Sequence, residues 1–329
     1  MNNYWAFHEM RDSAHAIDDS ATLREILAAD GYLYLPGVLD PQKVLDLRRD
    51  VVGVLDAAGW FMPGSDAMLA KTTMRPVREG DDEYFVGYDG IQRLEKFHTL
   101  AHDPALSAVM QAVLGPSAFP HPLKVARLVF PDHHEISTPP HQDFPNNQGT
   151  PSLTACWIPL GDCPVELGSL SILEGSHRLG VLPLQFGLGP GNRQVVLPRE
   201  RMRDLRWVTT DFAAGDVLIF GSMTVHASLH NADLRRMRLS VDYRYQPVDE
   251  PLTDLVLQPH FGRLSWDEIY AGWDDDQWQH YWRDLDLTVE TFDHSRHTVG
   301  EPTEEDYADV LRYQHRLSLH DESTPAAQA

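Results

Sequence analysis

The residues of this chain best suited to chemistry begin with His141 and Asp143, which are separated by one residue. On an extended chain, positions i and i+2 project from the same face, so an imidazole and a carboxylate placed this way can reach one metal ion. Pro139 and Pro140 precede them and are tolerated at the start or edge of a strand. Because an isolated His-x-Asp pair also occurs on ordinary surfaces, the motif needs a third ligand.

The third ligand is predicted to be His226. Residues 214–226 form a turn and then an apolar run that ends close to this histidine. Four competing histidines lack such framing: His133, His134, His177 and His230. Two histidines and one carboxylate with open positions make up the facial triad of non-haem iron(II) oxygenases, and the same ligands can also hold zinc.

A strand that begins at Arg238 supplies residues for an anionic cosubstrate. Arg238 and Ser240 share one face because side chains alternate along a strand. A guanidinium binds a carboxylate through two parallel hydrogen bonds, and a neighbouring hydroxyl can add a third. The distal carboxylate of 2-oxoglutarate requires such a partner. Ser228, two residues after His226, is a further contact, and Arg236 is the alternative to Arg238 if the register shifts.

The elements that position these residues change character near residue 120. Residues 1–120 are predicted to be mainly helical, and the expected elements are a helix over 22–27, a strand over 31–37, a helix from Pro41 to Gly59 and a helix over 104–114. Asp40 suits the N-cap of the second helix. Residues 61–95, rich in Gly, Asp and Met, are interpreted as a surface loop, with a mobile lid as the alternative.

Residues 121–247 instead show short apolar runs separated by Gly, Pro and Asn. The predicted strands are Leu123–Phe130, Leu153–Leu160, Ser169–Leu173, Trp207–Phe212, Asp216–Phe220 and Arg238–Gln246. Such a series is typical of a β-sandwich or jelly roll. Residues 248–320 are predicted to form a helical extension, and residues 321–329 a disordered tail. The aromatic residues expected to dock the extension on the barrel are Trp273, Trp278, Tyr281 and Trp282.

Composition sets further limits. A chain of 329 residues fits one domain, predicted to span residues 1–329. The formal net charge of −22 argues against nucleic acid and anionic membranes as partners. No apolar run approaches the roughly 20 residues of a membrane span, and the amino terminus shows no export signal, so a cytoplasmic protein is expected. Cys156 and Cys163, the two cysteines, are interpreted as packing residues.

Taken together, the motifs resemble the phytanoyl-CoA dioxygenase family of iron(II)- and 2-oxoglutarate-dependent oxygenases. The segments that carry the resemblance are Asp30–Leu39, His141–Asp143, Cys156–Leu160, Gly175–His177 and His226–Tyr245. The resemblance implies a mainly β fold with flanking helices, a double-stranded β-helix (a cupin-like jelly roll). It implies Fe(II) on His141, Asp143 and His226, O₂ as oxidant, and 2-oxoglutarate chelating the metal with its far carboxylate on Arg238. Ser228 and Trp157 stand where the family often lines the cosubstrate, although Trp157 fits a core position equally well.

The function implied by the resemblance is oxidation of a small-molecule metabolite. Related halogenases have a small residue in place of the carboxylate ligand, so the presence of Asp143 favours hydroxylation or another oxidation of an unactivated C–H bond, with release of succinate and CO₂. Hydroxylation is the default outcome, and desaturation, epoxidation or ring closure are the alternatives. Departures at Leu167-Gly168 and Glu174-Gly175 fall on turn positions and bear on subfamily rather than chemistry.

Three alternatives remain open at this point. They are a cupin-like metal-dependent isomerase or dioxygenase that does not use 2-oxoglutarate, a catalytically inactive binding protein, and a zinc hydrolase. The cations Lys124, Arg127 and Arg193 could meet an anionic group of the substrate, although each fits a surface or strand-ladder position better. No oligomeric state is predicted.

Overall fold

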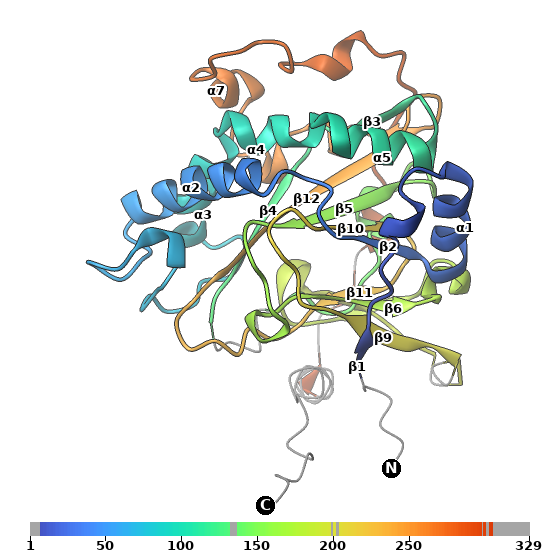
Figure 1. The fold of residues 1–329 in the computed structure, drawn as a ribbon, viewed down its shortest axis with the longest axis horizontal. Coiled ribbons are helices and arrows are strands. Elements are labelled where there is room, and N and C mark those ends of the chain that lie inside the picture. Colours follow the sequence, from blue (N-terminus) through green and yellow to red (C-terminus); the bar gives the residue numbers. More distant parts are fainter. Residues whose placement is uncertain are drawn as a thin grey trace, which may run out of the picture.

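The computed structural model describes residues 7–131, 137–198, 200–201, 204–297, 299–300 and 303–304. Its centre is a pair of β-sheets packed face to face (Figure 1). In the larger sheet the strands run in the order β2, β10, β5, β12 and β3, and β4 also pairs with β12. The bounds of these strands are β2 (Tyr32–Leu35), β3 (Ala118–Pro120), β4 (Val125–Val129), β5 (Thr154–Pro159), β10 (Val217–Gly221) and β12 (Arg238–Pro247).

The smaller sheet runs in the order β1, β9, β6 and β11. Its strands are β1 (Phe7–Glu9), β6 (Leu170–Glu174), β9 (Arg206–Thr209) and β11 (His226–Ser228). Side chains from both sheets meet between them, among them Trp157 and Leu218 from the larger sheet and Ile172 and Val208 from the smaller. The predicted jelly roll is confirmed, and each predicted strand is present with ends that differ by a few residues. Two short ribbons pair β7 (Leu184–Phe186) with β8 (Arg193–Val195) and β13 (Leu252–Thr253) with β14 (Val289–Glu290).

Helices from the amino-terminal third cover the outer face of the larger sheet (Figure 1). They are α1 (Ser20–Asp30), α2 (Pro41–Ala57), α3 (Asp82–Gln92), α4 (Glu95–Thr99) and α5 (Pro104–Leu114). The Asp40 carboxylate accepts from the backbone N–H of Gln42 and caps α2, as predicted. Helix α3 was not predicted: its Tyr84, Tyr88 and Ile91 are buried in the core, so only part of 61–95 is surface loop.

Strand β12 is buried along its whole length, yet its two faces differ. Leu239, Val241, Tyr243 and Tyr245 pack outward against the helices. The alternate residues Arg238, Ser240, Asp242, Arg244 and Gln246 are polar and point between the two sheets. A buried strand with one polar face places charged groups inside the barrel, where they need partners.

The carboxyl-terminal part differs from the predicted helical extension. Between residues 248 and 297 it holds one short α-helix, α7 (Trp266–Tyr270), and the 3-10 turns η9 (Asp254–Leu257), η10 (His260–Gly262), η11 (Tyr281–Asp284) and η12 (His294–His297). Aromatic residues nevertheless dock this segment on the rest of the chain, as expected: Trp278 stacks on His102, and the hydroxyl of Tyr281 donates to the carbonyl oxygen of Pro120. Trp282 instead packs within the segment, against Trp266 and Tyr270. Apolar stacking rather than helix repeats explains the aromatic content. The predicted tail 321–329 lies outside the described residues.

The remaining short elements connect the strands. They are the 3-10 turns η1 (Ala14–Ala16), η2 (Ala67–Leu69), η3 (Leu100–His102), η5 (Val165–Leu167), η6 (Ser176–Leu179) and η7 (Pro190–Asn192), and the four-residue helix α6 (Phe144–Asn147). Helix α6 directly follows Asp143, so its position bears on the site.

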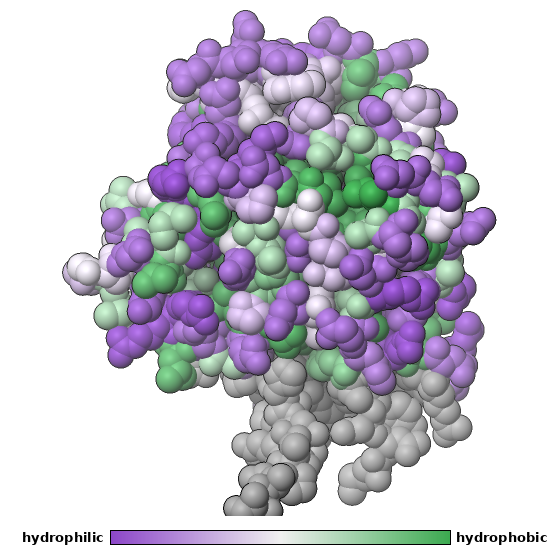
Figure 2. Space-filling model, in the orientation of Figure 1, coloured by the Kyte–Doolittle hydropathy of each residue, from purple (hydrophilic) through white to green (hydrophobic). Residues whose placement is uncertain are grey.

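The face drawn in Figure 2 is mainly hydrophilic, and hydrophobic residues gather near its middle between the polar ones. Cys156 and Cys163 are buried, unpaired and packed in the hydrophobic core, as predicted. Within the described ranges, none of the helices combines the length and apolar character needed to cross a bilayer. The cytoplasmic location and the absence of nucleic-acid partners stay predictions.

Candidate functional site

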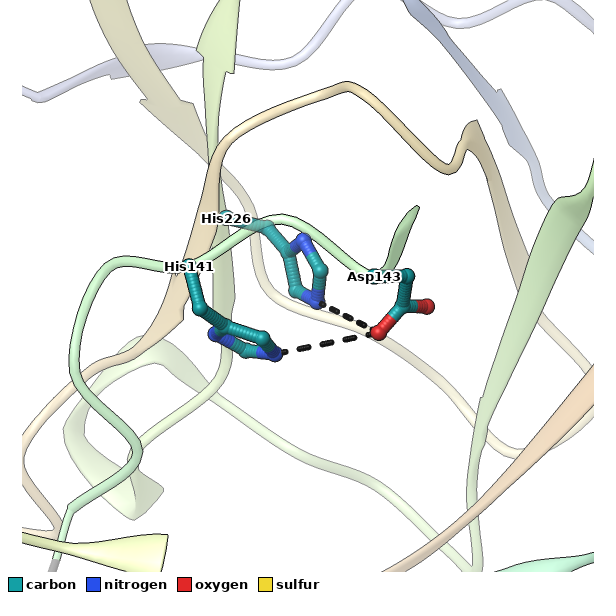
Figure 3. Close-up of side chains that lie close together, drawn as sticks. All are labelled: His141, Asp143 and His226. Atoms are coloured by element: carbon teal, nitrogen blue, oxygen red, sulfur yellow. Dashed lines mark ion pairs between the residues drawn. The ribbon is translucent and has the colours of Figure 1, made fainter. Parts of the chain in front are cut away.

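The side chains of His141, Asp143 and His226 converge inside the jelly roll (Figure 3). The Nε2 atoms of His141 and His226 lie 3.9 and 4.0 Å from the same oxygen, Oδ1 of Asp143. All three candidate ligand atoms lie within 4.8 Å of one another. No other set of three His, Cys, Asp or Glu side chains in the described part of the chain comes together as a possible metal site. Two imidazole nitrogens and a carboxylate oxygen at this spacing fit a single transition-metal ion.

Backbone carbonyls orient both imidazole rings. Nδ1 of His141 lies 2.9 Å from the carbonyl oxygen of Pro139, and Nδ1 of His226 lies 3.1 Å from that of Thr224. A carbonyl can only accept, so each Nδ1 must carry the proton and donate it. Each Nε2 then presents its lone pair to the centre of the triad, which is the tautomer that a metal ligand requires.

Asp143 reaches the triad by a different route from the one predicted. The residue has helical backbone angles, φ −73° and ψ −30°, and stands at the N-cap of α6 rather than on an extended strand. The two-residue period of a strand therefore does not explain why Asp143 approaches His141. The bend after His141, together with the start of α6, turns the carboxylate toward the two histidines.

His226 is also placed differently from the prediction. The apolar strand β10 ends at Gly221, and a turn then carries the chain from the larger sheet to the smaller one. His226 is the first residue of β11. His226 lies with His141 and Asp143, as expected for a third ligand, but the turn after β10, rather than the strand itself, delivers it.

Burial and charge set the ionisation of the triad. Burial lowers the pKa of His226, and burial followed by the charge of His226 lowers the pKa of His141 well below its usual range. For Asp143, burial alone would raise the pKa, but Arg244 and the two histidines outweigh burial and lower it. The site therefore holds two neutral imidazoles and one carboxylate, the charge states suited to a divalent metal.

The four residues predicted to hold the cosubstrate form one buried cluster. The guanidinium of Arg238 donates to Oγ of Ser240 at 2.6 Å and to Oγ of Ser228 at 2.7 Å. The indole N–H of Trp157 donates to the same Ser240 oxygen at 2.9 Å, and the Trp157 ring lies 5.7 Å from the guanidinium carbon. Ser228 lies two residues from His226, so this cluster adjoins the metal triad.

The cluster fits an incoming carboxylate. Arg238 is 2% exposed and forms no ion pair among the described residues, where its Nε has no hydrogen-bond partner either. A buried cation without a counter-charge is costly, so an anionic ligand is the expected partner. Ser240 accepts from both Arg238 and Trp157, which leaves its own proton for such a ligand.

Sequence reasoning missed Arg244. Its guanidinium contacts both carboxylate oxygens of Asp143, at 3.1 and 3.2 Å. The available signal was the strict alternation of polar and apolar residues from Arg238 to Gln246, which predicts that Arg244 shares the face of Arg238.

The other candidates lie elsewhere. His177 bonds to the carbonyl of Ala28, Arg236 pairs with Asp233, and neither joins the triad or the Arg238 cluster. Arg127 is a strand-ladder residue, as predicted, whereas Lys124 is buried rather than at the surface. His230 and Arg193 are also outside the triad. His133 and His134 fall outside the described residues.

Comparison with known proteins places the chain in a family. A sequence profile of the phytanoyl-CoA dioxygenase (PhyH) family matches residues 27–237, more than half of the chain. The chain belongs to the phytanoyl-CoA dioxygenase family. It is therefore an oxygenase that depends on Fe(II), 2-oxoglutarate and O₂, which confirms the resemblance seen in the sequence.

Two relatives of this oxygenase are 1-deoxypentalenic acid 11-beta-hydroxylases. The Streptomyces arenae protein is 30% identical over 252 residues, which cover 74% of this chain and 86% of the relative. The Streptomyces exfoliatus protein is 28% identical over 250 residues, with coverages of 72% and 84%.

Solved structures share the fold. The epimerase SnoN in complex with Fe3+, alpha ketoglutarate and nogalamycin RO aligns with a TM-score of 0.51 at 21% identity, over 71% of this chain and 86% of that chain. The carbocyclase SnoK from nogalamycin biosynthesis aligns with a TM-score of 0.50 at 22% identity, over 77% and 91%.

Proposed function

We propose that this oxygenase hydroxylates an unactivated C–H bond of a small-molecule metabolite and releases succinate and CO₂. In this proposal His141, Asp143 and His226 bind Fe(II). Arg238, with Ser240, Ser228 and Trp157, binds the distal carboxylate of 2-oxoglutarate. The observation that supports it most is the buried guanidinium of Arg238, which forms no ion pair in the described part of the chain and lies next to a triad of potential metal ligands.

The reaction balances without a further reductant. One oxygen atom of O₂ enters the product as a hydroxyl and the other enters succinate, while the C–H bond and the C1–C2 bond of 2-oxoglutarate break. O₂ is the oxidant: oxidative decarboxylation of 2-oxoglutarate supplies two of the four electrons that reduce it and the substrate C–H bond supplies the other two, and Fe(II) would be the site where O₂ is activated. The protein keeps two imidazoles neutral, holds one carboxylate ionised and fixes the orientation of the cosubstrate. The ring of Phe220, 4.3 Å from that of His226, adds an apolar wall beside the metal ligands.

The alternatives fit this site less well. An isomerase that needs no 2-oxoglutarate, or an inactive binding protein, leaves the charge of Arg238 buried without a partner. A zinc hydrolase has the same difficulty, because it requires no second carboxylate site. The hydroxylase names of the two relatives add support for a C–H oxidation.

A stimulated-turnover screen tests the proposal. Protein purified without oxygen is loaded with Fe(II) and 2-oxoglutarate and exposed to ¹⁸O₂ with each member of a panel that includes 1-deoxypentalenic acid. The expected result is a compound that increases succinate release and gains one labelled oxygen atom. Succinate release without any oxygenated product across the panel would count against hydroxylation. No succinate at all would count against the use of 2-oxoglutarate.

Two variants provide the controls. Asp143→Ala should lose succinate formation, because the metal is left with two protein ligands. Arg206→Gln removes an exposed arginine that pairs with Glu174 and belongs neither to the triad nor to the Arg238 cluster, and it should retain full turnover. Full activity of Asp143→Ala would overturn the assignment of the metal site.

A further inference from the structure

The two oxygens of the Asp143 carboxylate have different partners. The Nε2 atoms of both histidines lie closest to Oδ1 of the carboxylate, whereas Nε of Arg244 donates to Oδ2 at 3.2 Å. A second guanidinium nitrogen of Arg244 donates to Oδ1 at 3.1 Å. The carboxylate therefore presents one oxygen to the triad while the fork of Arg244 holds both oxygens in a fixed plane.

Arg244 is itself held in place by further charges. Another of its nitrogens lies 3.8 Å from Oδ2 of Asp242. Asp242 accepts from Nε of Arg127 at 2.9 Å, and Arg127 also pairs with Glu79 at 2.9 Å. The side chains of Arg244 and Asp143 are only 6% and 3% exposed. Water therefore competes weakly for these contacts, and the guanidinium has little freedom to leave the carboxylate.

The geometry has a consequence for the number of open metal positions. An octahedral ion with three protein ligands keeps three positions, enough for the two donor atoms of 2-oxoglutarate and one O₂. A carboxylate is able to chelate through both oxygens, as it often does with other ions. If Asp143 did so, one of the three open positions would be lost.

We propose that Arg244 is a positioning residue that holds Asp143 as a one-oxygen ligand and so preserves the third open position of the metal. The inference rests on the proposed function, since it presupposes that the triad binds Fe(II) and that 2-oxoglutarate chelates it. Removing the guanidinium frees Oδ2 to turn toward the ion. The variant should therefore lose more affinity for 2-oxoglutarate than for the metal.

Binding measurements without turnover test the role of Arg244. The dissociation constant of Fe(II) is measured anaerobically, and that of 2-oxoglutarate is measured at saturating Fe(II) from the charge-transfer absorption of the chelate. For Arg244→Gln we expect the 2-oxoglutarate constant to rise by about 10–100-fold, the range seen when outer-shell partners of metal ligands are removed, and the Fe(II) constant to rise by a smaller factor than the 2-oxoglutarate constant. Arg244→Lys keeps the charge but not the fork, so an intermediate loss is expected.

A second readout counts open positions directly. With Mn(II) in place of Fe(II) and no cosubstrate, the relaxation of water protons reports the number of exchangeable waters on the ion. That number should fall by about one in Arg244→Gln, because Asp143 takes an extra position. A purely structural role for Arg244 would lower thermal stability but leave the water number and the 2-oxoglutarate constant as in the native protein, and this result would overturn the inference.

The design separates two failures. If the native protein forms no Fe(II)–2-oxoglutarate complex, the proposed function fails before Arg244 is considered. If the native complex forms and Arg244→Gln binds 2-oxoglutarate and water equally well, only the positioning role is wrong. Arg263→Gln, which alters an exposed arginine paired with Asp89, is the matched control and should change none of these constants.

Discussion

His141 and His226 exchange a pair of backbone hydrogen bonds, each N–H donating to the carbonyl oxygen of the other at 3.0 Å. This isolated antiparallel bridge ties the loop before α6 to the first residue of β11. The two imidazole centroids consequently lie 4.0 Å apart. The main chain, rather than a side-chain contact, fixes the spacing of the two candidate ligands.

The first prediction follows from the bridge. His226→Ala should retain the fold, because the bridge is made by backbone atoms that alanine also has. Fe(II) affinity should fall by more than the roughly 10–100-fold typical of an outer-shell change, since a ligand itself is lost. Isothermal titration with Fe(II) under anaerobic conditions measures the affinity, and circular dichroism of the metal-free protein checks the fold. Retained affinity in a folded variant would exclude His226 as a ligand.

The second prediction separates the two serines that bond Arg238. The hydroxyl proton of Ser228 is directed to the carbonyl of Leu229 at 3.2 Å, whereas that of Ser240 has no acceptor among the described residues. Ser240 is therefore free to donate to a bound carboxylate, and a hydrogen bond to a charged group contributes about 1.5–3 kcal/mol.

The expected loss of 2-oxoglutarate affinity is about tenfold or more for Ser240→Ala and roughly threefold or less for Ser228→Ala. The anaerobic charge-transfer titration measures both. Equal losses in the two variants would mean that the serines act only by holding Arg238.

The third prediction concerns Lys124, which is 2% exposed and donates to the carbonyl of His121 and the hydroxyl of Tyr281. Burial lowers the pKa of Lys124 from 10.5 to about 7. Between these values the unfolded chain holds a proton that the folded chain lacks, so the free energy of unfolding rises with pH across this window. Below about pH 7 Lys124 is protonated in both states, and the buried ammonium group then destabilises the folded state most.

Lys124→Met should therefore raise the free energy of unfolding at neutral pH by about 1–2 kcal/mol and flatten its rise between pH 7 and 10.5. Urea unfolding at several pH values provides the measurement. Lys96→Met, which removes an exposed lysine paired with Asp50, is the control and should have little effect. If Lys124→Met were destabilised and kept the native pH dependence, burying the protonated Lys124 would not be what lowers the free energy of unfolding.

The sequence predicted the barrel well because alternation and turn residues are local signals. Short patterns predicted the strand that begins at Arg238, the N-cap at Asp40 and the choice of His226, which the fold does bring beside His141 and Asp143. Helix α3 was missed because Gly87 and Gly90 interrupt its apolar spacing. In the structure those glycines lie against Leu55, Trp60 and Val54, where a Cβ would clash with their side chains.

The conformation of Asp143 was not predictable from its neighbours. The residue reaches the triad because α6 begins after it and because Arg244, 101 positions later, grips its carboxylate. Both causes depend on tertiary structure. The pairing of Arg244 with Asp143 requires knowing which strand of the barrel faces the loop, and no local pattern contains that information.

The last prediction tests the two faces of β12 with adjacent residues. Leu239 faces away from the space between the two sheets, packs in the hydrophobic core beneath the helices and is 3% exposed. Leu239→Ala should cost about 2–5 kcal/mol of unfolding free energy while leaving the 2-oxoglutarate constant unchanged. Arg238→Met should do the reverse: it removes a buried charge that forms no ion pair among the described residues, so the metal-free protein should unfold at a higher temperature.

The same variant should bind 2-oxoglutarate at least about thirtyfold more weakly, because truncating one partner of a buried charge pair costs about 2–5 kcal/mol. In the native protein, added 2-oxoglutarate and Fe(II) should raise the unfolding temperature through binding to the folded state alone. Thermal scans with and without both ligands measure these shifts. An Arg238→Met protein that is still stabilised by 2-oxoglutarate as strongly as the native protein would place the carboxylate on another cation.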